Sequence, residues 1–297
     1  MADVYQMVTD RILTALDSGE IPWHRPWCSV RGGAYNRITE KPYSLLNQML
    51  LSHSGEYASL QQWNKLGGRI RKGERSEVVV FWKWCEPKKE ETQEAEDKTN
   101  DQEPDRILNR PILRYYRVFH ISQVEGVEPL PQRIRLYNQN PIEEAEKLVS
   151  SYLHREGIVL EEELSDTAYY SPARDLIHIP SIEQYKELSE YYSTLLHEAV
   201  HSTGHITRLN RAGLQNVSFG SAVYSKEELI AEIGSACLLS DLGIETDRSL
   251  TNSAAYIQGW LHALKNDRKL VVMAAAQAQK AAEYICVRYT RDRAENK

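Results

Sequence analysis

The chain has 297 residues, of which 41% are hydrophobic, so it is long enough to bury one large core or two ordinary ones. Its four cysteines lie far apart without a CxxC pair, which indicates neither a disulfide framework nor a thiolate zinc site. No apolar run approaches the ~18 residues of a membrane span. These features exclude a disulfide-stapled or membrane-spanning protein, and we expect a reduced, cytoplasmic protein with two domains.

The net charge of −6 is unevenly distributed along the chain. Residues 1–85 carry 11 basic and 8 acidic side chains, and residues 106–135 carry 6 and 2. Residues 86–105, between them, carry 3 and 9, and the remainder of the chain is acidic. A basic N-terminal part points to nucleic acid as a partner, although a basic face can also be merely solvated.

The first 127 residues predict a small α+β domain. Val4, Val8, Ile12 and Leu16 recur every four residues, which predicts an amphipathic helix and not the apolar core of a signal peptide. A short helix is expected at YSLLNQMLLSH. The segment VVVFWKW is rich in β-branched and aromatic residues and predicts a strand, whose antiparallel partner is ILRYYRVFHIS within 107–122.

The segment 86–105 between these strands contains no aromatic and no large aliphatic residue. It cannot bury enough surface to offset the entropy of ordering, so we expect a disordered loop inserted in the hairpin. The alternative is an interdomain linker. Clustered prolines and short polar residues place the expected linker at 128–140 instead.

Residues 141–297 predict the second domain. It opens with a helix at IEEAEKLVSSYLHREG, followed by short strands at VLEEEL, TAYYSP and DLIHIP, the last two joined by a turn around 172–175. Helices are then expected at YKELSEYYSTLLHEAVHSTG, SKEELIAEIGSACLLSDLG, NSAAYIQGWLHALKND and KLVVMAAAQAQKAAEYICVR. The fold class is therefore α+β throughout.

The nine residues HEAVHSTGH, at 197–205, predict a metal site. A spacing of four places His197 and His201 on one helical face, where both imidazoles can reach one Zn²⁺. Glu198 lies beside that face, where it can hold and deprotonate a metal-bound water. Zn²⁺ is the expected ion, with another divalent transition metal such as Mn²⁺ as the alternative.

A third ligand is needed. A metzincin would have histidine at position 207, which is Thr207, and His205 follows the helix-breaking Gly204 and fits a loop or second-sphere role better than a ligand role. Glu228 and Glu232 share a face of the helix KEELIAEIGSACL and would repel each other without a nearby positive charge. We assign Glu228 as ligand and Glu232 as acceptor of a histidine N–H. Exchanged roles, or a solvated acidic face, are the alternatives.

Residues 137–297 resemble a gluzincin-type zinc metallopeptidase, because EELIAE is similar to the third-ligand helix of that class. The resemblance implies peptidase activity on an unknown substrate, with TAYYSPARDLIHIP in the place of the strand that aligns the substrate. Tyr224, Tyr169 and His178 are candidates for a stabiliser of the transition state, and none of them is assigned.

Tryptophan and basic residues alternate in the N-terminal part, which holds five of the six tryptophans within residues 1–84. Aromatic rings stack on unpaired bases while Arg and Lys follow phosphates, a combination suited to single-stranded DNA. About half of these tryptophan rings are expected to be buried in the core. The loop RIRKGER and its flanking glycines allow close approach to phosphates. The predicted DNA-binding residues are Trp23, Arg25, Trp27, Arg37, Lys41, Arg69, Arg71, Lys72 and Arg75.

The segments PWHRPW, KPYSLLNQMLL, LGGRIRKGE with VVVFWKW, and RVFHISQVEG resemble the N-terminal domain of ArdC antirestriction proteins, a domain also found on TraC-type plasmid primases. The likeness covers essentially the whole chain, since those proteins join this domain to an HExxH domain in the same order. It implies a protein of conjugative plasmids that binds single-stranded DNA and shields it from host restriction.

Two readings of the activity remain open from the sequence. One is a peptidase that cleaves a host protein near the entering DNA. The other is a non-enzymatic DNA-coating protein whose metal domain is structural or contacts a protein. Glu198 favours the first, because a structural zinc site has no need of a general base. A nuclease or primase is disfavoured, because no acidic cluster suits two metal ions.

Overall fold

The computed structural model describes residues 3–25, 28, 33–84, 111–131, 140–211, 222–244 and 250–287. The acidic insert at 86–105, Trp27 and residues 132–139 of the expected linker lie outside the described residues. Among the described helices, none is long and apolar enough to cross a membrane. The described cysteines, Cys28, Cys237 and Cys286, are buried, and none of them forms a disulfide.

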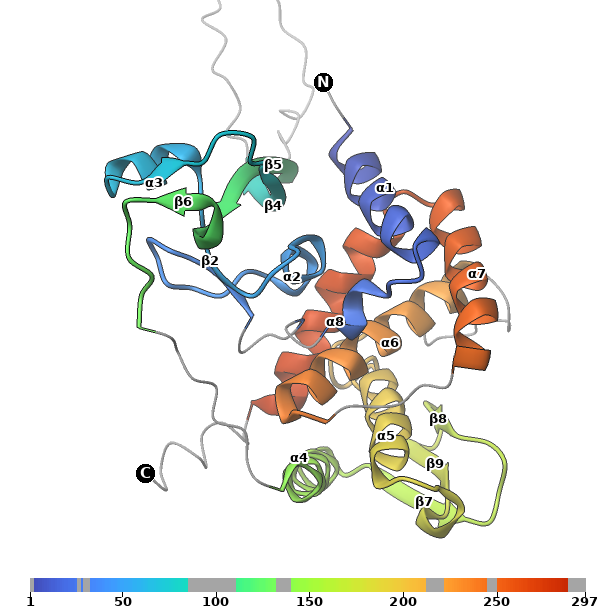
Figure 1. Ribbon diagram of the computed structural model, residues 1–297. Helices are drawn as coiled ribbons and strands as arrows, with labels where there is room; N and C mark the ends of the chain where they lie inside the picture. The colour runs from blue at the N-terminus through green and yellow to red at the C-terminus, as the bar shows by residue number, and fades with distance from the viewer. Residues whose placement is uncertain are drawn as a thin grey trace, which may run out of the picture.

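The N-terminal part is built around a small mixed sheet (Figure 1). Helix α1 (Val4–Asp17) and the 3-10 turn η1 (Pro22–His24) precede β1 (Ala34–Asn36), α2 (Leu45–Leu50), β2 (Gly55–Ala58) and α3 (Leu60–Lys65). Strands β3 (Arg69–Ile70), β4 (Glu77–Trp84) and β5 (Pro111–His120), the 3-10 turn η2 (Ile121–Gln123) and β6 (Val124–Glu125) follow. The main sheet has the order β1-β2-β5-β4, and β3 pairs with β6.

The predicted antiparallel pair of strands is confirmed. Strand β4 pairs along its whole length with β5, from Glu77 opposite Val118 to Trp84 opposite Pro111. Val79 and Val118 are buried on one face, and Val80 and Leu113 on the other. The free edge of β4 is held by Asn47 of α2, whose side chain both donates to the carbonyl of Val80 at 2.9 Å and accepts from its N–H at 2.8 Å.

The C-terminal part places helices around a three-stranded sheet. Helix α4 (Pro141–Glu156) leads into β7 (Val159–Glu163), β8 (Tyr169–Ser171), β9 (Leu176–Pro180) and the 3-10 turn η3 (Ile182–Gln184). The sheet order is β7-β9-β8, with β7 parallel and β8 antiparallel to β9, which confirms the three expected strands and their turn. Helices α5 (Leu188–Ser202), α6 (Ala222–Leu242), α7 (Leu250–Asn266) and α8 (Leu270–Cys286) follow.

The two parts share a large hydrophobic cluster, and two smaller clusters lie within the N-terminal part. The predicted apolar stripe of α1 is buried in the same cluster as α6, α7 and α8, with Val8, Ile12 and Leu16 each 1% exposed (Figure 1). The rings of Trp23 and Trp260 meet edge to face with centroids 6.5 Å apart. A fragment ending near residue 127 would therefore expose this stripe to water, so the predicted domain boundaries at 127 and 141 stay a proposal.

Candidate metal centre

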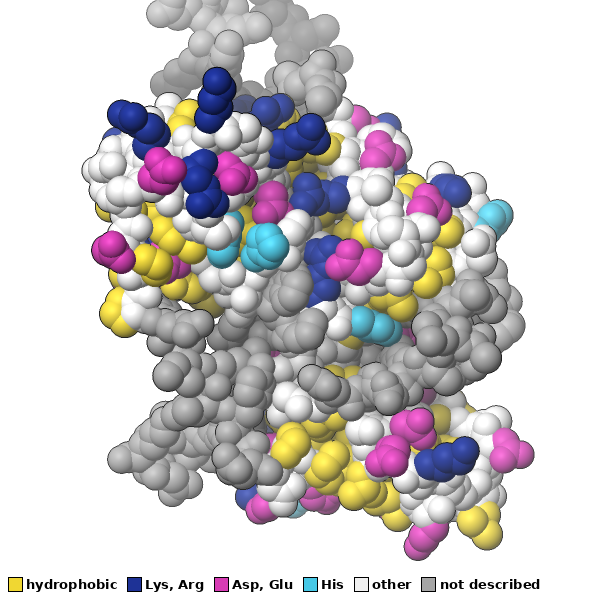
Figure 2. Space-filling view, in the orientation of Figure 1, with side chains coloured by type: hydrophobic (Ala, Val, Ile, Leu, Met, Phe, Trp, Pro, Cys, Tyr) yellow, Lys and Arg dark blue, Asp and Glu magenta, His cyan; other side chains and the backbone are white. Residues whose placement is uncertain are grey.

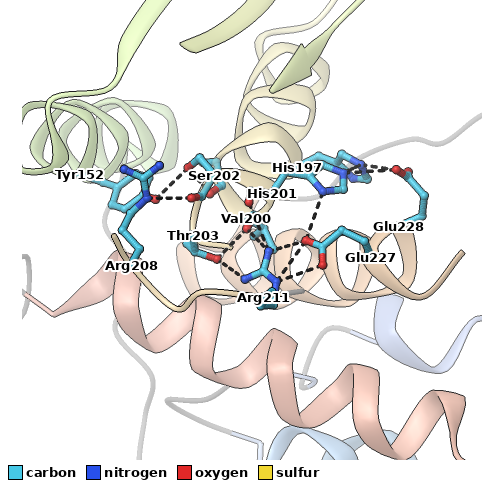
Figure 3. Close-up of polar contacts among 11 residues, drawn as sticks. Tyr152, His197, Val200, His201, Ser202, Thr203, Arg208, Arg211, Glu227 and Glu228 are labelled. Carbon is cyan, nitrogen blue, oxygen red and sulfur yellow. Dashed lines mark hydrogen bonds and ion pairs between the residues drawn. The ribbon is translucent and has the colours of Figure 1, made fainter. Parts of the chain in front are cut away.

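Close packing of α5 against α6 brings the predicted ligands together. Gly234 makes this approach possible, since a Cβ added there would lie 3.0 Å from Cγ1 of Val200 on α5. His197 and His201 occupy the face of α5 that looks toward α6, as the four-residue spacing predicts (Figure 3). The two imidazole centroids are 4.8 Å apart, with the ring planes inclined at 73°.

Three donor atoms converge at this contact. The Nε2 atoms of His197 and His201 lie 3.1 Å apart. The carboxylate of Glu228 lies 3.6 Å from Nε2 of His197 and 3.5 Å from Nε2 of His201. Ligands at ~2.0–2.2 Å around a tetrahedral Zn²⁺ are separated by about 3.3–3.6 Å. The two separations to Glu228 lie in this range and the one between the histidines is slightly shorter, so these residues fit one divalent metal ion.

A carboxylate lies behind each histidine. Oε1 of Glu232 is 3.9 Å from Nδ1 of His197, and Oε1 of Glu227 is 3.5 Å from Nδ1 of His201. Carboxylates at this position fix the ring and raise the basicity of a metal-binding imidazole. Burial alone would lower the pKa of His197, but Glu228, Glu232 and Glu198 raise it above its ordinary value. The pocket is therefore strongly negative and suited to a cation.

Glu227 was missed by the sequence reasoning, which considered only the two glutamates spaced by four. Its neighbour in the chain, Glu228, was the only signal for it. Glu227 is 4% exposed and accepts two hydrogen bonds of 3.1 Å from Nε of Arg211, one on each oxygen (Figure 3). Burial alone would raise the pKa of Glu227, but contacts with His201 and Arg211 lower it below its ordinary value. It is held as a carboxylate.

Arg211 ties this carboxylate to the end of α5. Its Nη1 donates to Oγ1 of Thr203 at 2.6 Å, and its Nη2 donates to the carbonyls of Val200 at 2.8 Å and His201 at 3.3 Å (Figure 3). The carbonyls of Val200 and His201 lie at the C-terminal end of α5, where they also accept from the backbone N–H groups of Thr203 and Gly204. The Arg211 side chain therefore connects the end of α5 to Glu227.

Glu198 lies on α5 next to the histidines and is 7% exposed. Tyr185, which follows η3, is in electrostatic contact with it. Burial first, and then the carboxylates of Glu198 and Glu190, raise the pKa of Tyr185, although a hydrogen bond with Thr194 lowers it. A protonated phenol near Glu198 is a hydrogen-bond donor that the sequence reasoning did not include among its candidates.

The other described residues considered for the site are not among its converging donors. His205 contacts Oγ1 of Thr207 at 2.8 Å and is not among the converging donors of the described residues. The ring of Tyr169 stacks on His178 at 4.9 Å, and His178 is within 2.9 Å of Oγ of Ser165. The side chain of Tyr224 lies outside the described part of the chain.

Two family models match this chain, one in each of its two parts. Residues 143–277 match the family model of a zincin-like metallopeptidase. Residues 2–119 match the family model of the N-terminal domain of anti-restriction factor ArdC. An uncharacterized protein, y4eC, from Sinorhizobium fredii (strain NBRC 101917 / NGR234) is 32% identical over 295 residues, which cover 95% of this chain and 91% of that protein.

The crystal structure of the antirestriction ArdC protein from the R388 plasmid, in its Mn(II)-bound form, has a TM-score of 0.71 and 32% identity to this chain. The match covers 96% of this chain and 97% of that one. The chain belongs to the ArdC antirestriction protein family. The metal-free structure of the same R388 protein gives a TM-score of 0.68.

The ArdC likeness extends to larger proteins. DNA primase TraC from Escherichia coli is 31% identical over 293 residues, which are 95% of this chain but only 27% of the primase. The chain thus spans about a quarter of that relative. The resemblance stated from the sequence, to ArdC and to a zincin-like metallopeptidase, is confirmed.

Part of the predicted DNA-binding set is structural in this ArdC chain. Trp23 is fully buried against Trp260 and offers no face to a base, which corrects its assignment. Arg25 pairs with Glu20 at 2.6 Å and donates to the carbonyls of Met49 and Leu51. Arg37 forms an ion pair with Glu56, and its side chain is 13% exposed. These arginines satisfy internal acceptors, so the sequence pattern overcounted the groups open to phosphate.

The remaining predicted groups of this ArdC chain are exposed. Arg69, Arg71, Lys72 and Arg75 surround the turn between β3 and β4, where Gly73 has a positive φ of 91°. Arg71 also reaches back to the carbonyl of Ser122. Figure 2 shows Lys and Arg side chains gathered over the lobe that carries α3, β4, β5 and β6. Lys41 is exposed as well, and Trp27 lies outside the described residues.

Proposed function

We propose that this chain is an antirestriction protein that binds single-stranded DNA without sequence preference and carries a zinc-dependent peptidase site. The observation that carries the proposal is the convergence of His197, His201 and Glu228, with Glu198 beside them on the same helix. A site with three protein ligands and an adjacent carboxylate suits hydrolysis better than structural support. Zn²⁺ is the proposed resident ion, and Mn²⁺ is the alternative suggested by the R388 structure.

The residues of the chain have separate tasks in this proposal. When bound, the metal supplies a Lewis acid to the carbonyl that is attacked. Glu198 takes the proton from the attacking water and passes it to the leaving amine. Glu227 and Glu232 hold the two imidazoles in the tautomer that leaves the lone pair of Nε2 available to bind the metal.

The proposed DNA binding rests on exposed basic side chains and on the similarity of the chain to known proteins. Arg69, Lys72 and Arg75 are exposed and have no acidic partner among the described residues. The N-terminal ArdC region and the TraC primases are the relatives whose names connect this chain with DNA. We propose that the protein acts in the cytoplasm of a cell that receives plasmid DNA, where a host protein is the proposed peptidase substrate.

A non-enzymatic role is the second candidate, and the shared core favours it. Because α1 packs against α7 and α8, and η1 against α6, the helices of the metal-binding part also stabilise the N-terminal part. In that case the metal would stabilise the fold without turnover.

Proteomics of recipient cells separates the two candidates. Cells that receive plasmid DNA are prepared with the wild-type protein or with Glu198→Gln, and new protein N-termini are mapped by mass spectrometry. Peptidase function predicts N-termini that depend on Glu198, together with weaker protection of incoming DNA in the variant. Equal protection and identical N-termini would support the non-enzymatic role.

A further inference from the structure

An aromatic and basic surface on the strands β4 and β5 has no part in the metal centre. Phe81 and Tyr116 are 45% and 46% exposed, although their rings meet at 5.7 Å in an edge-to-face contact. Two aromatic rings that pack together but stay open to water are uncommon on a surface with no partner. Their exposure therefore indicates that a binding partner covers the two rings.

The strand register places basic groups around this ring pair. Phe81 is opposite Arg114, Lys83 is opposite Ile112, and Tyr116 is opposite Val79. Side chains alternate along a strand, so all of these project from one side of the paired strands. We call the exposed members the hairpin face: Phe81, Lys83, Ile112, Arg114 and Tyr116.

The hairpin face is positively charged. Arg114 and Lys83 are exposed, and neither has a carboxylate partner among the described residues. Glu77 is the only acidic residue of the two strands. It lies at their far end, paired with Arg11 at 3.0 Å and hydrogen-bonded by the hydroxyl of Tyr57 at 2.9 Å. Its charge is thus neutralised away from the face.

We propose that the hairpin face is the platform on which bases of single-stranded DNA stack. The ring faces of Phe81 and Tyr116 meet unpaired bases, and Arg114 and Lys83 meet the phosphates. A duplex hides its base faces, and a two-fold contact with a second copy would bring like charges together. A polyanion with open bases is the partner that matches both features. The inference rests on the proposed DNA binding and assigns it a surface.

Anisotropy titrations of the full chain test this assignment. The probe is a fluorescein-labelled 20-nucleotide oligo(dT), measured at three salt concentrations. Tyr116→Ala is expected to weaken binding about 5- to 100-fold without changing the salt slope, because stacking does not release counterions. Arg114→Gln is expected to reduce the slope of log K against log salt concentration by about 0.7, the change expected for the loss of one phosphate contact. Tyr116→Trp is expected to keep the affinity.

The opposite side of the same strands supplies a matched control. Tyr115 is 38% exposed and lies opposite Val80 there, so Tyr115→Ala is expected to bind like the wild type. Phe81 also touches Tyr43 at 6.2 Å, so Phe81→Leu, which keeps the bulk without the aromatic ring, is the second variant. Circular dichroism confirms that each variant is folded.

Two outcomes would overturn the assignment. One is wild-type affinity in Tyr116→Ala and Phe81→Leu while Lys72→Glu/Arg75→Glu loses binding, in which case the DNA-binding function stands on another surface. The other is a change in sedimentation of Tyr116→Ala from dimer to monomer with unchanged DNA affinity, which would make the face a self-association surface. If the wild type binds no oligonucleotide, the proposed function itself fails.

Discussion

Arg211 and Glu227 form a buried ion pair in which Nε of the guanidinium donates to both carboxylate oxygens at 3.1 Å. Each side chain is 5% exposed. The pair joins the loop after the HExxH helix to α6, the helix that carries Glu228. It also faces His201, whose Nδ1 is 3.5 Å from Glu227. The pair therefore couples the stability of the fold to the shape of the metal site.

Removing the cation of this pair is expected to be costly. Arg211→Met leaves the carboxylate of Glu227 buried without its partner, which destabilises a fold by about 3–5 kcal/mol. The double variant Arg211→Met/Glu227→Leu removes both charges and is expected to lose less than the single variant. Urea unfolding of the metal-free proteins measures both. A double variant less stable than Arg211→Met would show that the unpaired carboxylate is not the main cause of the destabilisation.

Glu227→Gln tests the support that this carboxylate gives to His201. The amide keeps the shape but not the charge, so metal affinity is expected to fall about 10- to 100-fold while the fold persists. Competition with a zinc-binding dye measures the affinity. Glu143→Gln, an exposed acid on α4, is the control and should bind metal normally. Normal affinity in Glu227→Gln would reduce its role to packing.

The ligand assignment predicts a contrast between two glutamates. The wild type is expected to hold about one metal ion per chain, Glu228→Ala to lose most of it, and Glu198→Gln to retain it. The reason is that Glu228 converges on both Nε2 atoms, while Glu198 is assigned to proton transfer. Elemental analysis of the purified proteins measures the metal content. Full retention in Glu228→Ala together with loss in Glu232→Ala would exchange the two roles.

The turn between β8 and β9 predicts an acid-dependent loss of stability. Burial alone would raise the pKa of Asp175, but hydrogen bonds from Arg208 and Tyr170 lower it below its ordinary value. A lowered folded pKa means that the stabilisation is present above the ordinary aspartate pKa and disappears as the pH falls through the folded value. Asp175→Asn is expected to cost about 1–3 kcal/mol at pH 7.

This difference should shrink below about pH 4. Asparagine also tolerates the left-handed backbone at this position, where φ is 48°, so the change isolates the charge. Urea unfolding of both proteins from pH 7 to pH 3 measures the difference. Asp166→Asn, on a nearby exposed loop, is the control. A difference that is constant with pH would contradict the electrostatic account.

Deletion of residues 88–103 from the acidic insert should leave the midpoint of thermal unfolding nearly unchanged. The deletion should also tighten binding to oligo(dT) at low salt, because the removed acidic groups compete with phosphates for the basic lobe. Differential scanning fluorimetry and anisotropy measure the two quantities. Loss of folding would show that the insert is part of the packed structure, and unchanged affinity would show that it does not compete.

Local rules were enough to predict several elements. The four-residue repeat of apolar residues in α1, the β-rich segments of β4 and β5, and the His197–His201 spacing follow from helix and strand periods alone. Each depends on neighbours in the chain, and the structure has the helix and the strand pair where the pattern predicts them. The convergence of Glu228 on the histidines also agrees with the spacing argument, and its role as a ligand stays a prediction.

Only the tertiary structure decided which polar and aromatic groups are free to act. The sequence pattern treated Trp23 and Arg25 alike as DNA-binding candidates, yet Trp23 is buried against Trp260 and Arg25 is bound to internal carbonyls. Phe81 was not a candidate from the sequence, and the structure leaves it exposed beside Tyr116. Glu227 on α6 meets Arg211, which follows α5, only in the folded chain. Burial and pairing depend on contacts between residues far apart in the chain, and no local period encodes them.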